Sequence, residues 1–178
     1  MADRCLYPRL TERSRFSGLG STRAAKAARV LPGPEVKGLW MTTALVAADD
    51  MPADRPRLCN PEDVADMVRN IAYRPVEEVL FIPLDTEAKP LGVVRIGQGD
   101  ISESIVTVGE AARAMLLAGS ERGILVHNHP SGNAALSRQD KMLARRLSQG
   151  LRLIQGELLD SIVVTRDDYV SMAETVEM

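Results

Sequence analysis

The chain has little of several residue types whose abundance would point to a class of protein. Aromatic residues make up 3% of its 178 residues, so the core has to be aliphatic and few rings can stack on nucleic-acid bases. The two cysteines, Cys5 and Cys59, cannot build a disulfide framework and lack the Cys-x-x-Cys spacing of a zinc site. We therefore expect reduced thiols and a cytoplasmic protein.

Long apolar runs are missing as well. No stretch approaches the roughly 18 residues that a membrane-spanning helix needs. Residues 1–6 lack the basic start and apolar core of a secretion signal. With 22 Lys and Arg against 24 Asp and Glu, the net charge of −2 is ordinary for a soluble protein. We therefore expect no membrane partner.

The charge is unevenly distributed along the chain. Residues 1–38 contain eight Lys and Arg and three Asp and Glu, a net charge of +5 that leaves −7 for the remainder. This pattern predicts a basic, partly flexible N-terminal arm. Such an arm is compatible with weak contact to DNA, although a solvated tail is the commoner explanation.

One segment of the arm carries a motif with two interpretations. Gly18 and Gly20 precede the alanine-rich residues 22–31, a pattern that resembles the second half of a helix-hairpin-helix, whose turn amides can hold a DNA phosphate. An ordinary alanine helix after a glycine turn explains the pattern equally well. Residues 39–56 are expected to be a linker whose structure the sequence does not indicate, with Trp40 as an anchor.

Residues 57–178 have the periodicity of one folded domain. Asn60 followed by Pro61 is a good helix start, and apolar residues then recur at helical spacing at Val64, Met67, Val68 and Ile71. The pattern predicts strands at residues 78–84, 91–96, 104–108, 123–128, 158–165 and 169–171, and helices at 110–117 and 138–149, the last ending at Gly150. The expected fold class is α/β (α+β), with a mixed, mostly antiparallel sheet flanked by helices.

The two histidines of the chain are the most informative residues. His127 and His129 follow the apolar residues 123–126. Side chains two residues apart in a strand point to the same face, so both imidazoles are placed to share a cation. One histidine alone would more often be a solvated or hydrogen-bonded side chain. The pair at a strand end favours a metal site.

Asp140 is the third candidate ligand. It lies in the first turn of the predicted helix after residues 127–129, where it could return to the imidazoles. A structural explanation is equally available, because Ser137 and Asp140 have the Ser-x-x-Asp spacing of a capping box. The two roles are compatible. Two imidazoles and one carboxylate form a three-ligand zinc set that leaves a fourth position open.

These motifs resemble a known family. The segments 127–132, His-Asn-His-Pro-Ser-Gly, and 137–140, Ser-Arg-Gln-Asp, are similar to the JAMM (MPN+, JAB domain) metalloprotease motif, in its RadC-like branch. The resemblance runs from about residue 57 to 174. It implies a JAB/MPN (cytidine-deaminase-like) fold, one Zn²⁺ per chain held by His127, His129 and Asp140, and a zinc-dependent metallopeptidase or isopeptidase that acts on an unknown peptide or isopeptide substrate.

The resemblance also implies two catalytic side chains. Hydrolysis needs a general base, which in this family is an upstream glutamate, and the matching text favours Glu77 with Glu78 as second choice. Strand alternation allows only one of them to face the metal. Ser137 matches the family serine, whose hydroxyl stabilises the reaction's oxyanion, and a plain helix cap is the competing explanation.

Two departures leave the substrate open. Ser161 stands where the branch often has histidine, and Thr107 begins a segment that replaces His-Pro-Arg-Glu. Neither change removes a ligand. The alternatives are a DNA-associated protein in which the metal domain is accessory, and a pseudo-enzyme whose metal only stabilises the fold. The sequence does not indicate an oligomeric state.

Overall fold

The computed structural model describes Tyr7, residues 55–99 and residues 107–175. The chain divides into two compact units, Met1–Arg9 with Pro56–Met178, and Leu10–Arg55. The expected alanine helix at 22–31, the linker with Trp40 and residues 104–106 of the strand predicted at 104–108 lie outside the described residues. The end of that predicted strand is wrong, because Thr107 caps a helix that begins at Val108. The basic arm, apart from Tyr7, lies outside them too.

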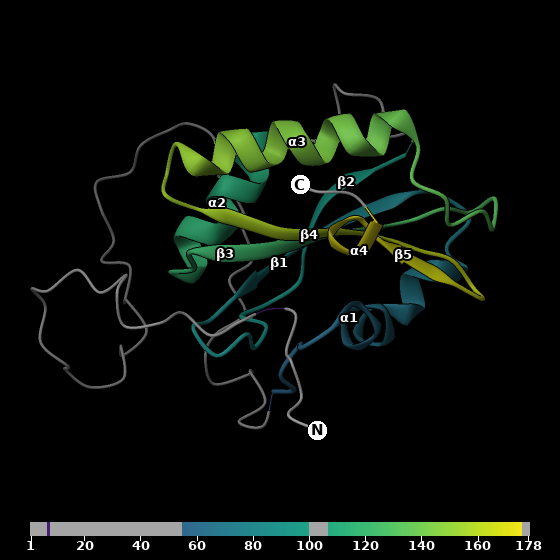
Figure 1. The fold of residues 1–178 in the computed structure, drawn as a ribbon, viewed down its shortest axis with the longest axis horizontal. Helices are drawn as coiled ribbons and strands as arrows, with labels where there is room; N and C mark the ends of the chain where they lie inside the picture. The colour runs from purple at the N-terminus through teal and green to yellow at the C-terminus, as the bar shows by residue number, and fades with distance from the viewer. Residues whose placement is uncertain (1–6, 8–54, 100–106, 176–178) are drawn as a thin grey trace, which may run out of the picture. The chain divides into compact units, whose positions relative to one another are not determined.

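A five-stranded sheet forms the centre of the first unit (Figure 1). Its strand order is β2-β1-β3-β4-β5, and only β3 and β4 run parallel, which confirms the mixed, mostly antiparallel α/β fold. The strands are β1 (Glu78–Leu84), β2 (Val94–Gln98), β3 (Arg122–Asn128), β4 (Glu157–Val164) and β5 (Tyr169–Ser171).

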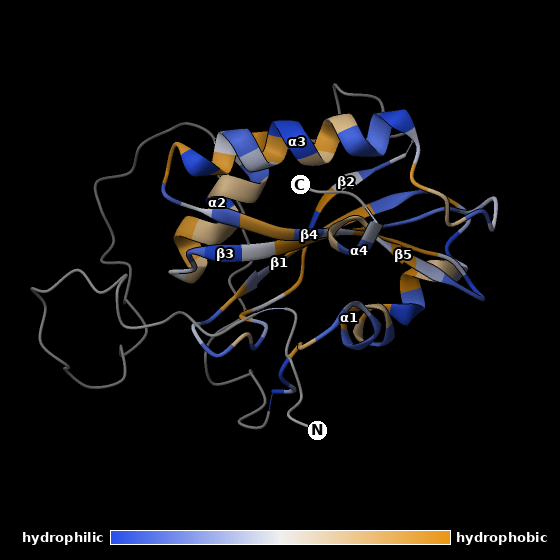
Figure 2. Ribbon diagram, viewed as in Figure 1, coloured by the Kyte–Doolittle hydropathy of each residue, from blue (hydrophilic) through white to orange (hydrophobic). Residues whose placement is uncertain are grey.

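Helices cover both faces of this sheet. Helices α2 and α3 lie on one face and α1 on the other, as Figure 1 shows. The described helices are α1 (Pro61–Met67), the short 3-10 helix η3 (Arg69–Tyr73), α2 (Val108–Ala118), α3 (Arg138–Arg152) and α4 (Met172–Thr175). In Figure 2 the central strands are largely hydrophobic, while α3 alternates between hydrophilic and hydrophobic residues. Helix α3 is therefore amphipathic and rests on the sheet by one side.

Every residue of β1 and β3 is buried, because these two strands have neighbours on both edges and helices on both faces. Two aliphatic cores result. One joins α1 and η3 to the side chains of Leu80 and Ile82, and the other joins α2 and α3 to those of Val79 and Phe81. Alternate residues of the same strand thus serve opposite cores, as the period of two requires.

The predicted start of α1 is confirmed and its end is corrected. Asn60 and Asp63 form a reciprocal capping box with Pro61 at the first helical position. The helix ends at Met67 and gives way to η3, which places Ile71 in the core through a tighter turn than the predicted continuous helix.

The predicted bounds of two other elements, β2 and α3, are also wrong. Strand β2 begins at Val94 rather than at residue 91 and continues to Gln98, beyond the predicted end at residue 96. Helix α3 does not stop at Gly150 but continues to Arg152. A Cβ atom at position 150 would lie 2.3 Å from Cγ1 of Val108, so the glycine allows α2 and α3 to approach closely. Its role is tertiary contact rather than helix termination.

A buried carboxylate links distant parts of the chain. Asp160 on β4 is fully buried and accepts hydrogen bonds from Oη of Tyr7 at 2.8 Å and Oγ of Ser171 at 2.7 Å. It also accepts from the backbone N–H groups of Ser161 and Ala173. Four donors satisfy a charge that would otherwise be costly to bury.

Among the described residues, no helix is long and apolar enough to cross a bilayer.

Candidate metal centre

Both histidines lie at the carboxyl end of β3. His127 is the sixth residue of that strand and is completely buried, whereas His129 follows the strand and is half-buried. Their Nε2 atoms lie 3.2 Å apart. The predicted arrangement of two imidazoles on one face is therefore present, with one ring in the core and the other near solvent.

Asp140 approaches the same point from the first turn of α3. Its Oδ1 lies 3.0 Å from Nε2 of His127, and its Oδ2 lies 3.6 Å from Nε2 of His129. The same carboxylate accepts a hydrogen bond of 2.7 Å from the N–H of Ser137, whose Oγ accepts from the N–H of Asp140. The capping box and the convergence on the histidines thus coexist, because the cap fixes the backbone that carries Asp140.

The outer nitrogens of the two rings define which atoms can bind an ion. Nδ1 of His129 lies 2.8 Å from the carbonyl oxygen of Asn133, and since a carbonyl only accepts, Nδ1 carries the proton. Its Nε2 lone pair therefore points to the centre. This is the outer-ring hydrogen bond that orients metal-binding histidines. Nδ1 of His127 is buried and has no hydrogen-bond partner among the described residues.

The distances between the side chains of His127, His129 and Asp140 are close to those between the ligands of a tetrahedral cation. Ligand atoms about 2.0–2.1 Å from a tetrahedral zinc ion lie roughly 3.3–3.4 Å apart. Nε2 of His127 lies 3.2 Å from Nε2 of His129 and 3.0 Å from Oδ1 of Asp140, whereas the 3.6 Å contact of His129 is with the other carboxylate oxygen, Oδ2. With one oxygen of Asp140 counted, the three ligand atoms lie within 4.8 Å of one another. The residues present therefore suit a small divalent metal ion.

The electrostatics of the three side chains are coupled. Burial would raise the pKa of Asp140, but hydrogen bonds with His127 and His129 outweigh burial and hold this pKa well below its usual range. The hydrogen bond to Asp140 raises the pKa of His129 in spite of the ring's burial, and the negative charge of Glu77 adds to the rise. Asp140 is therefore ionised, as a metal ligand must be.

The two candidate glutamates occupy different surroundings. Val79 pairs directly with His127 and therefore shares its face. Glu77 immediately precedes β1, and continuing the alternation by one residue assigns Glu77 to the face of His127 and Glu78 to the opposite face. Glu77 is half-buried and close enough to His129 to influence its pKa. Glu78 is buried, and its carboxylate lies 3.9 Å from Arg74 and 3.7 Å from Arg95.

Asn128 is a residue of this region that the sequence did not single out. Fully buried between the two histidines, it accepts through Oδ1 from the N–H of Glu78 at 2.7 Å. Its Nδ2 donates to the carbonyl oxygens of Arg74 and Val76. Asn128 thereby fastens the segment that carries Glu77 to the strand that carries His127. The position of Asn128 between the two candidate histidine ligands is the feature of the sequence that could have indicated this role.

The two departures noted in the sequence have structural positions. Thr107 is the N-cap of α2, where its Oγ1 accepts from the N–H of Glu110 at 3.3 Å. Ser161 lies in β4 beside Leu125, is fully buried, and its Oγ has no partner among the described residues. Neither side chain is one of the three converging donors.

The match to known proteins decides the family. Residues 58–177 match the model of the RadC-like JAB domain. The chain belongs to the RadC-like JAB domain family. In this member of the family, two imidazoles and one carboxylate meet at the end of β3 and the start of α3.

Relatives in this family cover most of the chain. A UPF0758 protein from Desulfitobacterium hafniense is 31% identical over 92% of this chain and 68% of its own length. Another, from Symbiobacterium thermophilum, is 33% identical over 95% of this chain and 68% of its own length. A third, from Methanosarcina acetivorans, is 34% identical over 66% of this chain and 52% of its own length. Their names state no activity.

Proposed function

We propose that this RadC-like JAB domain protein is a zinc-dependent metallopeptidase or isopeptidase that hydrolyses a peptide or isopeptide bond. The observation that carries the proposal is the convergence of His127, His129 and Asp140 within 4.8 Å, with Glu77 close by. A purely structural carboxylate cap would not need two imidazoles against it, one of them completely buried. The cytoplasm, expected from the sequence, stays the predicted location.

His127, His129 and Asp140 are the residues that would hold one zinc ion per chain. Two nitrogens and one carboxylate oxygen are donors that zinc accepts readily, and three protein ligands leave one position for water or substrate. When bound, zinc lowers the pKa of a water molecule and polarises a carbonyl group.

Glu77 and Ser137 supply the remaining functions in this proposal. Glu77 lies on the face of His127, so its carboxylate can take the proton of the attacking water and return it to the leaving amine. Ser137 uses its oxygen to accept from the N–H of Asp140 and keeps its own hydrogen for donation to the carbonyl oxygen of the substrate. Asn128 positions Glu77 and touches no reacting atom.

The test combines metal analysis with cleavage of a library of peptides and isopeptide-linked peptides. The purified chain should contain about one zinc ion, and it should cleave library members. Glu77→Gln should keep the zinc and lose cleavage, whereas His127→Ala should lose both. Zinc retained by the original chain without any cleavage would favour a pseudo-enzyme. A chain without zinc would contradict the proposal as a whole.

A further inference from the structure

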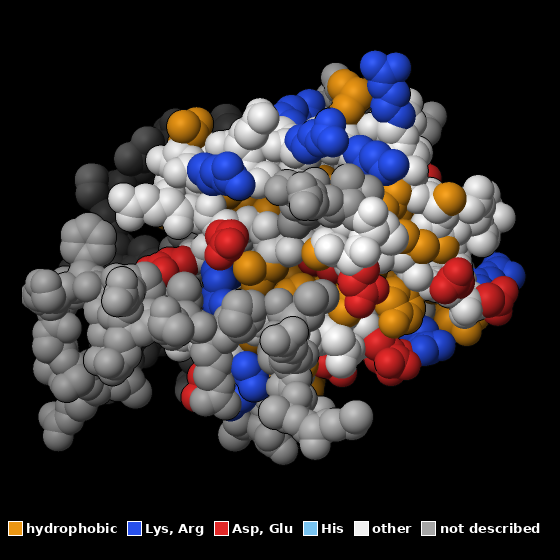
Figure 3. Space-filling view, viewed as in Figure 1, with side chains coloured by type: hydrophobic (Ala, Val, Ile, Leu, Met, Phe, Trp, Pro, Cys, Tyr) orange, Lys and Arg blue, Asp and Glu red, His pale blue; other side chains and the backbone are white. Residues whose placement is uncertain are grey.

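Positive charge in the described part of the chain is concentrated on one helix. Helix α3 carries five Lys and Arg and one acid, Asp140, which is buried. The other described residues include nine Lys and Arg against fourteen Asp and Glu. Figure 3 shows the basic side chains gathered over α3, with acidic side chains lower on the same face. A basic helix thus crosses an otherwise acidic body.

Four of these cations form a straight stripe on the outward side of α3. They recur at intervals of three, four and seven residues, which keeps them on one side of a helix, at Arg138, Lys141, Arg145 and Arg152. Given a rise of 1.5 Å per residue, the stripe is about 21 Å long. Ser148 falls within the same line.

Within the described part of the chain, the stripe differs from the other basic residues because its side chains have no partner. None of its four side chains makes an ion pair or hydrogen bond with another described residue. Elsewhere, basic side chains contact carboxylates in the pairs Arg69–Asp66, Arg74–Glu78, Lys89–Glu87, Arg95–Glu78 and Arg113–Glu110. Like charges one turn apart destabilise a helix, so an anionic partner would relieve this repulsion.

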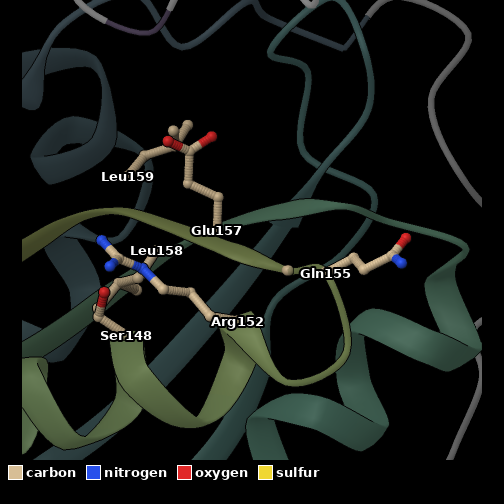
Figure 4. Close-up of a pocket in the computed structure, with 7 residues that line it drawn as sticks. Ser148, Arg152, Gln155, Glu157, Leu158 and Leu159 are labelled. Carbon is tan, nitrogen blue, oxygen red and sulfur yellow. The ribbon is translucent and has the colours of Figure 1, made fainter. Parts of the chain in front are cut away.

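A pocket at the carboxyl end of α3 indicates what kind of anionic partner the stripe would bind. The cavity has a volume of about 470 Å³ and lies between the end of α3 and the start of β4 (Figure 4). Its lining combines polar groups with apolar ones, at Ser148, Arg152, Gln155, Glu157, Leu158 and Leu159. Exposed Met142, between Lys141 and Arg145, and exposed Leu153, after Arg152, add apolar surface next to the stripe.

This mixture favours an acidic polypeptide over a nucleic acid. A polypeptide supplies both carboxylates for the stripe and apolar side chains for the pocket. Alternate side chains of an extended chain are about 6.6 Å apart, close to the 5.4 Å between turns of α3. A nucleic-acid backbone offers phosphates only, and a duplex would extend from this single helix over acidic surface (Figure 3).

We propose that the outward stripe of α3 binds an acidic polypeptide segment. Because Asp140 lies in the first turn of the same helix, the bound segment leads toward the candidate metal centre. As a statement about substrate, the inference rests on the proposed peptidase function. As a statement about binding, it can be tested without any cleavage.

The experiment measures fluorescence anisotropy with the zinc-loaded full chain and four labelled probes. These are a 14-residue peptide of alternating Glu and Leu, its Lys-Leu counterpart, and single-stranded and duplex DNA oligonucleotides of matched charge. The double variant Arg145→Ser with Arg152→Ser removes two cations from the stripe. Arg69→Ser with Arg166→Ser removes two exposed cations elsewhere and is the matched control. Zinc content and the urea midpoint establish that each variant is folded.

The Glu-Leu peptide should bind, and binding should weaken about tenfold in the stripe variant and by less than twofold in the control. Equal losses in both variants would overturn the proposal, because attraction would then be general. Tighter binding of either oligonucleotide than of the Glu-Leu peptide would assign the stripe to nucleic acid instead. Binding of the Glu-Leu peptide by a chain that cleaves no member of the peptide and isopeptide library would contradict the peptidase and leave the acidic-segment proposal standing.

Discussion

Nε2 of His127 lies 3.0 Å from Oδ1 of Asp140, which joins the end of a buried central strand to the first turn of an amphipathic helix. The contact depends on how α3 is seated on the sheet as well as on the capping box that aims the carboxylate. The candidate centre is therefore preorganised by the fold, and it requires little rearrangement to take up an ion.

Glu77→Gln should abolish hydrolysis while zinc stays bound. A positioned general base contributes about 10²–10⁴-fold to such reactions, and glutamine cannot accept the proton. Glu78→Gln is the control, because its side chain faces away from His127 and pairs with Arg74 and Arg95. Turnover of the best library substrate is the measurement. A larger loss in the Glu78 variant would reverse the assignment of the base.

Zinc affinity should fall steeply on acidification. Asp140 raises the pKa of His129 above its usual value of 6.5, so in the metal-free protein protons compete for this ring even near neutral pH. Below the raised pKa, affinity should drop by about tenfold or more per pH unit. Chelator competition between pH 8 and pH 5.5 measures this. An affinity unchanged across that range would show that His129 is not a ligand.

The raised pKa of His129 also affects the stability of the metal-free chain, and here the effect of acidification is favourable. A raised pKa in the folded state stabilises the fold at pH values below 6.5, and this contribution is lost as the pH rises through the raised value. After treatment with a chelator, the unfolding free energy of the original chain should decrease between pH 6 and pH 8. In His129→Asn this decrease should be absent. Matching pH profiles for the two proteins would contradict the shift.

Gly123→Ala should destabilise the fold by about 1–3 kcal/mol. A Cβ atom at position 123 would lie 2.2 Å from Cζ of Phe81, which packs against this glycine in the middle of the sheet. The ring would have to move within a close-packed core. Gly92→Ala is the control, because a Cβ there meets nothing within 4 Å. Urea unfolding distinguishes them, and similar midpoints for the two variants would contradict this packing.

Tyr7→Phe should cost about 1.5–3 kcal/mol, the usual contribution of a hydrogen bond to a charged group. It removes the Tyr7 hydroxyl that donates to the fully buried carboxylate of Asp160. Tyr73→Phe, at a side chain that is 59% exposed, should change the unfolding free energy by less than about 0.5 kcal/mol. If Tyr7→Phe were equally mild, the Tyr7–Asp160 hydrogen bond would contribute little to stability in solution.

Local patterns predicted much of this molecule. The apolar runs of β1 and β3 and the capping residues of α1 and α3 depend mainly on residues near them in sequence, and the structure places these elements close to the predicted bounds. The candidate ligands followed from side-chain alternation at His127 and His129 and from the spacing of Ser137 and Asp140. Such features need no knowledge of distant contacts.

The ends of helices and strands, and the contacts that support the candidate metal centre, were harder to predict from the sequence. The role of Gly150 depends on Val108, which belongs to another helix. Asn128 holds the segment of Glu77 through bonds to residues about fifty positions earlier in the chain. The burial of Tyr7 against Asp160 joins positions even further apart. Residue patterns carry little information about pairs that meet only after the sheet has assembled.

The sequence by itself determined which side chains are available for chemistry, because the donor atoms and their spacing along strand and helix are properties of the chain. Tertiary structure alone decided that the three candidate ligands meet, that Glu77 lies near His129, and that four cations on α3 have no partner among the described residues. The physical reason is that these distances are set by the pairing of β1 with β3 and by the seating of α3 on the sheet, which are long-range contacts of the folded chain.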